Sequence, residues 1–188
     1  MSLALLVLVV LAVAGGIAAG WWLAPHRRRA AATRPDRVRR ILLPFTGGSI
    51  SKRAFDAAVR LARVEHATLM PCYLATVPLH LPVDAPLPRR CLSVMPLLEA
   101  IEQRAAAQDV DVDARIVPGR SYRDALRRAL AGEPVDRVIV SATSNAGEGF
   151  GSDDLVWLLQ KADAEVLILR PAPEDHRLVS GNGLVGHF

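Results

Sequence analysis

The sequence has few aromatic residues, two cysteines and no histidine in an arrangement typical of a catalytic or metal site. Cys72 and Cys91 form no CxxC pair, which argues against a structural zinc motif. We expect two free thiols in a reducing compartment, with a disulfide or a redox switch as the alternative. A Walker-type Gly-Lys-Ser/Thr and a Gly-x-Ser-x-Gly elbow are also absent. The sequence therefore predicts no metal site, no catalytic residues and no enzyme activity. The histidines are His26, His66, His80, His176 and His187.

A broad basic surface is also lacking. Residues 26–40 carry seven arginines and one aspartate, which leaves 16 basic and 18 acidic residues for residues 41–188. Domains that bind nucleic acid typically cluster Lys and Arg over a whole face. We therefore predict no nucleic-acid partner.

The first 25 residues contain no charged side chain. Residues 2–24 are apolar on all faces, and as a helix they would span about 35 Å, enough for a hydrocarbon core of about 30 Å. Trp21 and Trp22 stand at the end of the segment, where indole rings favour the membrane interface. Gly16 and Gly20 form a GxxxG pattern that allows close helix packing. We predict a transmembrane helix over residues 1–25, with a cleaved signal peptide and a buried soluble helix as alternatives.

Arginines follow this segment directly, beginning with Arg27, Arg28 and Arg29. A signal peptide carries its positive charge before the apolar core, so the order favours a permanent anchor. Basic residues beside a membrane helix stay on the cytoplasmic side and attract anionic membrane lipid. We predict a single-pass protein of the inner cell membrane. Its N-terminus lies outside, residues 26–39 form a basic linker, and the C-terminal domain is cytoplasmic.

From residue 40 onward, short apolar runs alternate with amphipathic segments. Residues 40–45 predict a buried strand, and residues 51–65 predict a helix that Ser49 or Ser51 caps. Alternating strands and helices favour a parallel sheet covered on both faces, a doubly wound, Rossmann-like α/β fold over residues 40–171. The further predicted strands are 67–77, 110–119, 135–142 and 164–171, and the further helices are 92–108, 121–132 and 152–162.

Proline and glycine mark the expected boundaries. The proline-dense stretch 78–90 is predicted to be irregular, and Pro96 is expected in the first turn of the next helix. Gly132 is expected to close the helix that begins near residue 121. Residues 172–188 show no clear period and are predicted to form a flexible tail.

Three stretches together resemble the universal stress protein family, over about 130 residues. They are "ILLPFTGGSISKRAFDAAVRLA", "PGRSYRDALRRA" and "DRVIVSATSNAGEGFGSDDLVWLLQKADAEVLILRP". The resemblance implies a five-stranded sheet with strand order 3-2-1-4-5, counted along the domain. It also implies a homodimer that pairs through the last strand, residues 166–169.

Nucleotide-binding members of that family carry Gly-x2-Gly, nine residues and then Gly-Ser or Gly-Thr in the loop after the fourth strand. Here Ser141 and Ser144 take the places of the first two glycines, and only six residues separate Ser144 from Gly151. Thr46 replaces the family's aspartate after the first strand. The resemblance thus implies a degenerate nucleotide site. Its candidate residues are Thr46, Gly47, Gly48, Gly119, Ser141, Ser144, Gly149, Gly151 and Ser152.

The start of the last predicted helix has features that favour and features that oppose the binding of an anion. Its free N–H groups at Ser152 favour an anion, but Asp153 and Asp154 would repel a phosphate. We predict that no cofactor binds, with ATP or another anion in an altered pocket as the alternatives.

The sequence as a whole favours a membrane-anchored, non-catalytic binding or adaptor module in a stress response. The alternatives are an accessory subunit of a larger membrane protein complex and a nucleotide-dependent regulator.

Overall fold

A computed structural model describes residues 39–85, 88–142, 149–170 and 177–179, all of which belong to one compact unit, Val38–Phe188. The predicted membrane segment, with Gly16, Gly20, Trp21 and Trp22, lies outside the described residues, as does nearly all of the basic linker. Within the described ranges, no helix is both long and apolar enough to cross a membrane.

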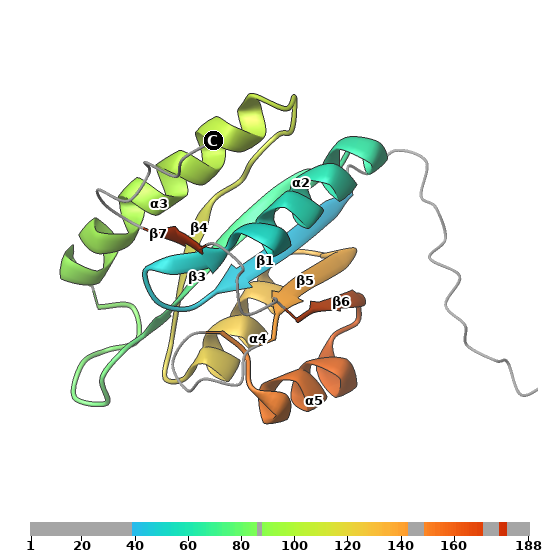
Figure 1. The fold of residues 1–188 in the computed structure, drawn as a ribbon. Helices are drawn as coiled ribbons and strands as arrows, with labels where there is room; N and C mark the ends of the chain where they lie inside the picture. Colours follow the sequence, from blue (N-terminus) through green and yellow to red (C-terminus); the bar gives the residue numbers. More distant parts are fainter. Residues whose placement is uncertain (1–38, 86–87, 143–148, 171–176, 180–188) are drawn as a thin grey trace, which may run out of the picture. The chain divides into compact units, whose positions relative to one another are not determined.

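Five parallel strands form the central sheet in the order β4-β3-β1-β5-β6 (Figure 1). This order confirms both the predicted fold class and the strand order that the resemblance implied. Each strand falls inside a predicted range, because each contains a short run of apolar residues. The strands are β1 (Arg40–Phe45), β3 (Thr68–Thr76), β4 (Arg115–Gly119), β5 (Arg137–Ser141) and β6 (Glu165–Leu169).

Helices cover both faces of the sheet, and the alternation of side chains along β1 separates two cores. Ile41 and Leu43 pack with α2 and α3 on one face, whereas Leu42 packs with α4 and α5 on the other. Alternate residues of a strand point to opposite faces, so a strand covered on both sides is apolar throughout. The helices are α2 (Lys52–Glu65), α3 (Pro88–Ala106), α4 (Tyr122–Gly132) and α5 (Ser152–Lys161).

The predicted start of one helix was wrong. α3 begins four residues earlier than expected, so Pro96 lies inside the helix rather than in its first turn. The helix continues past Pro96 because Leu97 and Leu98 are buried on the sheet. α4 ends at Gly132 as predicted, although Gly132 does not form a left-handed cap. Glu133 is extended instead, as expected for a residue that precedes a proline.

A second, two-stranded sheet was not predicted. β2 (Ser49–Ser51) pairs antiparallel with β7 (Arg177–Val179), which lies in the stretch expected to be a tail. β2 connects β1 to α2, and its last residue, Ser51, caps α2 by accepting a hydrogen bond from the Ala54 N–H at 3.2 Å. Three-residue strands are too short to show a sequence period, so nothing in the pattern indicated them.

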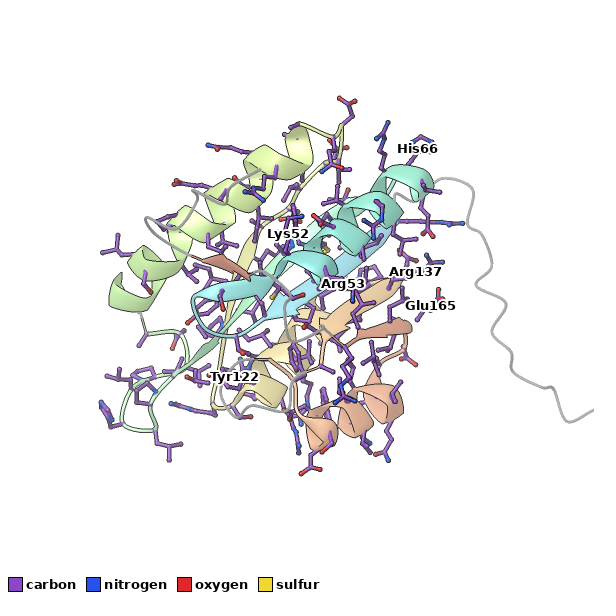
Figure 2. The ribbon with its side chains drawn as sticks, in the orientation of Figure 1. Lys52, Arg53, His66, Tyr122, Arg137 and Glu165 are labelled. Atoms are coloured by element: carbon purple, nitrogen blue, oxygen red, sulfur yellow. The ribbon has the colours of Figure 1, made fainter. Side chains whose placement is uncertain are left out.

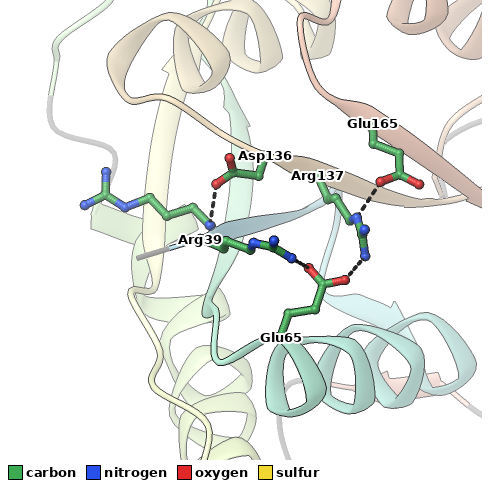
Figure 3. Close-up of polar contacts among 6 residues, drawn as sticks. Arg39, Glu65, Asp136, Arg137 and Glu165 are labelled. Carbon is green, nitrogen blue, oxygen red and sulfur yellow. Dashed lines mark hydrogen bonds and ion pairs between the residues drawn. The ribbon is translucent and has the colours of Figure 1, made fainter. Parts of the chain in front are cut away.

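Ion pairs join the elements at the amino ends of the strands (Figure 3). The Glu65 carboxylate, whose side chain is 14% exposed, contacts Arg137 and lies 3.4 Å from the Arg39 guanidinium. Arg137 Nε also donates to Glu165 at 2.6 Å. A carboxylate this buried requires positively charged partners. The ion pairs at this edge of the sheet therefore hold β1, α2, β5 and β6 together.

Candidate functional site

The candidate site lies at the carboxyl ends of the strands. Figure 2 shows His66, Arg137 and Glu165 toward one end of the sheet, and Lys52 and Tyr122, which begin α2 and α4, toward the other. Ligands of doubly wound folds bind beyond the carboxyl ends of the strands, where helices begin. The predicted site residues that the structure describes fall at this second end.

Thr46 closes the space at the end of β1. Its side chain is buried, at 3% exposure, and its Oγ1 accepts a hydrogen bond from the Gly149 N–H at 3.2 Å. Gly149 has a φ of 122°, a conformation that favours glycine. A backbone N–H that could face a phosphate is therefore already bonded to a protein hydroxyl. Thr46 thus has a structural role: its hydroxyl holds Gly149 against the end of β1.

A cavity of about 20 Å³ remains beside this contact. Its wall includes Thr46, Ser141, Gly149 and the residues of β2. This volume is about the room that one water molecule needs, whereas pockets for small organic ligands measure about 300 Å³ or more. This cavity is therefore far smaller than a nucleotide.

Phe150 fills the next part of the site. It is 3% exposed, packs in the core beneath α4 and α5, and also lines the cavity. Its N–H lies 3.4 Å from the Ser141 carbonyl, and it forms a parallel bridge with Ala142. The far end of the glycine loop is thus held against β5 by backbone pairing and by burial of an aromatic ring.

The start of α5 differs from what the sequence implied. Gly151 occupies the cap position without a side-chain hydrogen bond, and its carbonyl accepts from the N–H groups of Asp154 and Leu155 at 3.1 Å. Asp154 was expected to repel a phosphate. It instead pairs with Arg123 Nε at 2.7 Å, which offsets its charge. Asp153 is exposed, so its charge still faces solvent near the helix start.

The structure brings together only part of the predicted set. Thr46, Ser141 and Gly149 line one cavity, and Gly47, with a φ of 78°, makes the turn between β1 and β2. Gly48 faces open space. Ser144 lies outside the described residues. Gly151 and Ser152 start α5 and do not line the cavity.

Gly119 has a different role, because β3 separates its strand from β1. A Cβ atom on Gly119 would lie 2.3 Å from the backbone nitrogen of Ala125 in α4. Next to it, Arg120 binds the Pro78 carbonyl at 2.6 Å and donates its N–H to Asp124 at 2.9 Å. This end of β4 is packed against α4 and the β3–α3 connection, which identifies Gly119 as a packing residue.

Sequence reasoning missed three features of the site. In β2, Ser49 was named only as a possible helix cap and Ile50 was not named, although both line the cavity. Phe150 was treated as part of a glycine loop. One signal was available: a lone aromatic residue just before a helix often packs back against it or its neighbours, as an apolar residue preceding a helix cap does.

Cys72 is a buried free cysteine in β3. Burial raises the pKa of its thiol to about 12, and the lowering effect of Arg115 is smaller. A thiol that stays protonated near neutral pH is a poor nucleophile and a poor metal ligand. Within the described ranges, no group of three or more His, Cys, Asp or Glu residues could hold a metal ion.

Neither a protein-family model nor a curated protein matches the sequence. Solved structures do match. A universal stress protein family member from Burkholderia pseudomallei is 21% identical with a TM-score of 0.52, covering 70% of this chain and 96% of that chain. A universal stress protein in complex with cAMP is also 21% identical, with a TM-score of 0.52, covering 72% of this chain and 98% of its own.

A third match is a universal stress protein family protein from Arabidopsis thaliana with AMP bound. It is 15% identical with a TM-score of 0.51, and the match covers 72% of this chain and 94% of that one. At these identities the comparisons establish the fold. Residues 39–170 have the α/β fold of the universal stress proteins.

Proposed function

We propose that this chain is a membrane-anchored, non-catalytic binding module that has kept the universal stress protein fold with a closed nucleotide site. The contact of Thr46 Oγ1 with the Gly149 N–H, beside a cavity of about 20 Å³, carries the proposal. Similar structures hold cAMP or AMP, so closure of this region distinguishes the chain from them. A module without a small ligand acts through the surfaces that it presents to other proteins.

The anchor is the second part of the proposal. It is supported by the uncharged stretch of residues 2–24 and by the arginines that follow, which favour a cytoplasmic domain. Arg27, Arg28 and Arg29 add attraction to anionic lipid of about 1 kcal/mol each near the surface. The module would thus work at the inner face of the membrane.

A second copy of the chain is the proposed partner, and the open edge of β6 is the proposed contact. β6 is the last strand of the five-stranded sheet. The Glu165 N–H and the Leu169 carbonyl bond toward the β5 side. Alternate residues of a strand direct their backbone groups to opposite sides, so Val166, Ile168 and Arg170 direct theirs to the open edge.

This alternation selects a register. A two-fold antiparallel pairing centred on Ile168 places it opposite its own copy and places Val166 opposite the second copy's Arg170. All three outward-facing residues then use their N–H and carbonyl groups. Ile168 is 40% exposed, so its apolar side chain can contact a second copy. Unpaired strand edges readily accept a second strand.

Ile168→Pro is expected to convert the dimer to a monomer without unfolding the domain. Proline removes an N–H that faces the open edge, a position where strands tolerate it. If the anchor is present, the full chain should sediment with the membrane fraction and require detergent for release. The released protein should then behave as a homodimer in light scattering. The Ile168→Val control should remain a dimer. A monomeric parent, or a dimeric Ile168→Pro protein, would contradict the pairing.

The same purification separates the alternatives. Reproducible co-purification of other membrane proteins in a fixed ratio would favour an accessory subunit of a larger complex, whereas a lone homodimer would exclude it. A nucleotide-dependent regulator requires nucleotide binding to the domain, which the closed site opposes.

A further inference from the structure

The short strand β7 touches the candidate site through β2. Ser49 pairs with Val179, Ile50 with Leu178 and Ser51 with Arg177. Ser49, Ile50 and Ser51 all line the cavity beside Thr46. Figure 1 shows β7 as a short red arrow apart from β6 and next to the chain that leads into α2. β7, which lies near the C-terminal end of the chain, thus supports the wall of the cavity that β2 forms.

The position of β2 connects its pairing with β7 to the wall of the cavity. β2 follows the Gly47 turn at the end of β1 and ends at Ser51, which caps α2. Ile50 is 4% exposed, so movement of β2 would disturb both the turn that carries Thr46 and the start of the helix. Holding β2 in place therefore holds the cavity wall in place.

The pairing between β2 and β7 is short enough to break easily. β2 and β7 form a separate two-stranded sheet of three residues each, and β7 has no place in the five-stranded sheet. A two-stranded ladder of this length is marginally stable alone, and such elements open at much lower free energy than a core strand.

We propose that Arg177–Val179 is a releasable strap that keeps the cavity at the carboxyl edge narrow, and that its departure from β2 widens the cavity and exposes more of its wall to solvent. The inference rests on the proposed function in that it concerns the same cavity. It adds a regulatory element: a partner that binds Arg177–Val179 in place of β2 would widen the cavity.

The test uses the full chain in detergent micelles with Cys91→Ser and Ser141→Cys, so that an introduced thiol lines the cavity. One variant ends at residue 176 and lacks β7, and its matched control ends at residue 179 and keeps it. Loss of β7 should raise alkylation of position 141, and deuterium uptake of residues 46–51, by about tenfold or more, as loss of one or two hydrogen bonds implies. The control should match the full chain.

Any of three results would contradict the proposal that Arg177–Val179 is a strap. In the variant that ends at residue 176, alkylation could stay unchanged while deuterium uptake rises, or both could stay unchanged. Alternatively, the control that ends at residue 179 could change as much as the shorter variant. Uptake by β1 must remain slow, which shows that the fold persists; if the truncation unfolds the domain, Leu178→Pro in the full chain provides the same comparison. No nucleotide enters this experiment, so its failure would leave the proposed closed site to be judged on ligand binding alone.

Discussion

Gly119→Ala is expected to destabilise the domain by about 3 kcal/mol or to prevent folding. The new methyl group would lie 2.3 Å from Ala125 N and 2.7 Å from Ala125 Cα, both of them backbone atoms. A flexible side chain could move aside, but here β4 and α4 would have to separate. The measurement is the free energy of unfolding of residues 38–188 in urea.

Gly132→Ala is the matched control. Gly132 is the last residue of α4, and a Cβ there meets nothing within 4 Å. Alanine favours helix over glycine by up to about 1 kcal/mol, so this variant should be as stable as the parent or slightly more so. Equal stabilities for the two variants would show that β4 and α4 are not in close contact at Gly119.

Phe150→Ala is expected to cost about 3 kcal/mol and to enlarge the cavity beside Thr46. The ring is 3% exposed, and removing it leaves a hole between β5 and the helices above it. The change does not free the Gly149 N–H, which remains bonded to Thr46, so nucleotide binding should not appear. Urea unfolding and thermal shift with millimolar AMP measure the two effects.

Val156→Ala serves as the comparison for this change, because Val156 is apolar but 54% exposed on α5. Its substitution should alter stability by no more than about 0.5 kcal/mol. A Phe150→Ala protein as stable as the Val156→Ala protein would mean that Phe150 does not fill the site. Tight AMP binding by Phe150→Ala would mean that the ring alone closes it.

Much of the fold could be predicted because its strands and helices are long enough to carry a period. β1 is apolar and buried at every position after Arg40, and α2 carries a buried stripe that includes Phe55, Ala58 and Val59. Such patterns indicate which faces of a strand or helix are buried against other elements. The alternation of strands and helices then restricts the topology of the sheet. The Ser51 cap of α2 was likewise expected, as one of two candidates.

The site was harder to predict because its state depends on contacts between distant residues. The replacement at Thr46 was visible in the sequence, but not its bond to Gly149, 103 residues away. Asp154 was taken as an isolated charge, since its partner Arg123 lies on another helix. β2 and β7 have three residues each, and their pairing joins opposite ends of the domain.

Calorimetric titration of residues 38–188 with magnesium ATP, and separately with AMP and cAMP, tests the closed site most directly. The fragment is a compact unit with its own core. We expect no heat of binding and no thermal stabilisation at millimolar nucleotide, because a cavity of about 20 Å³ is too small for a nucleotide. Binding at micromolar strength would contradict the closed site and make the domain a nucleotide-dependent regulator.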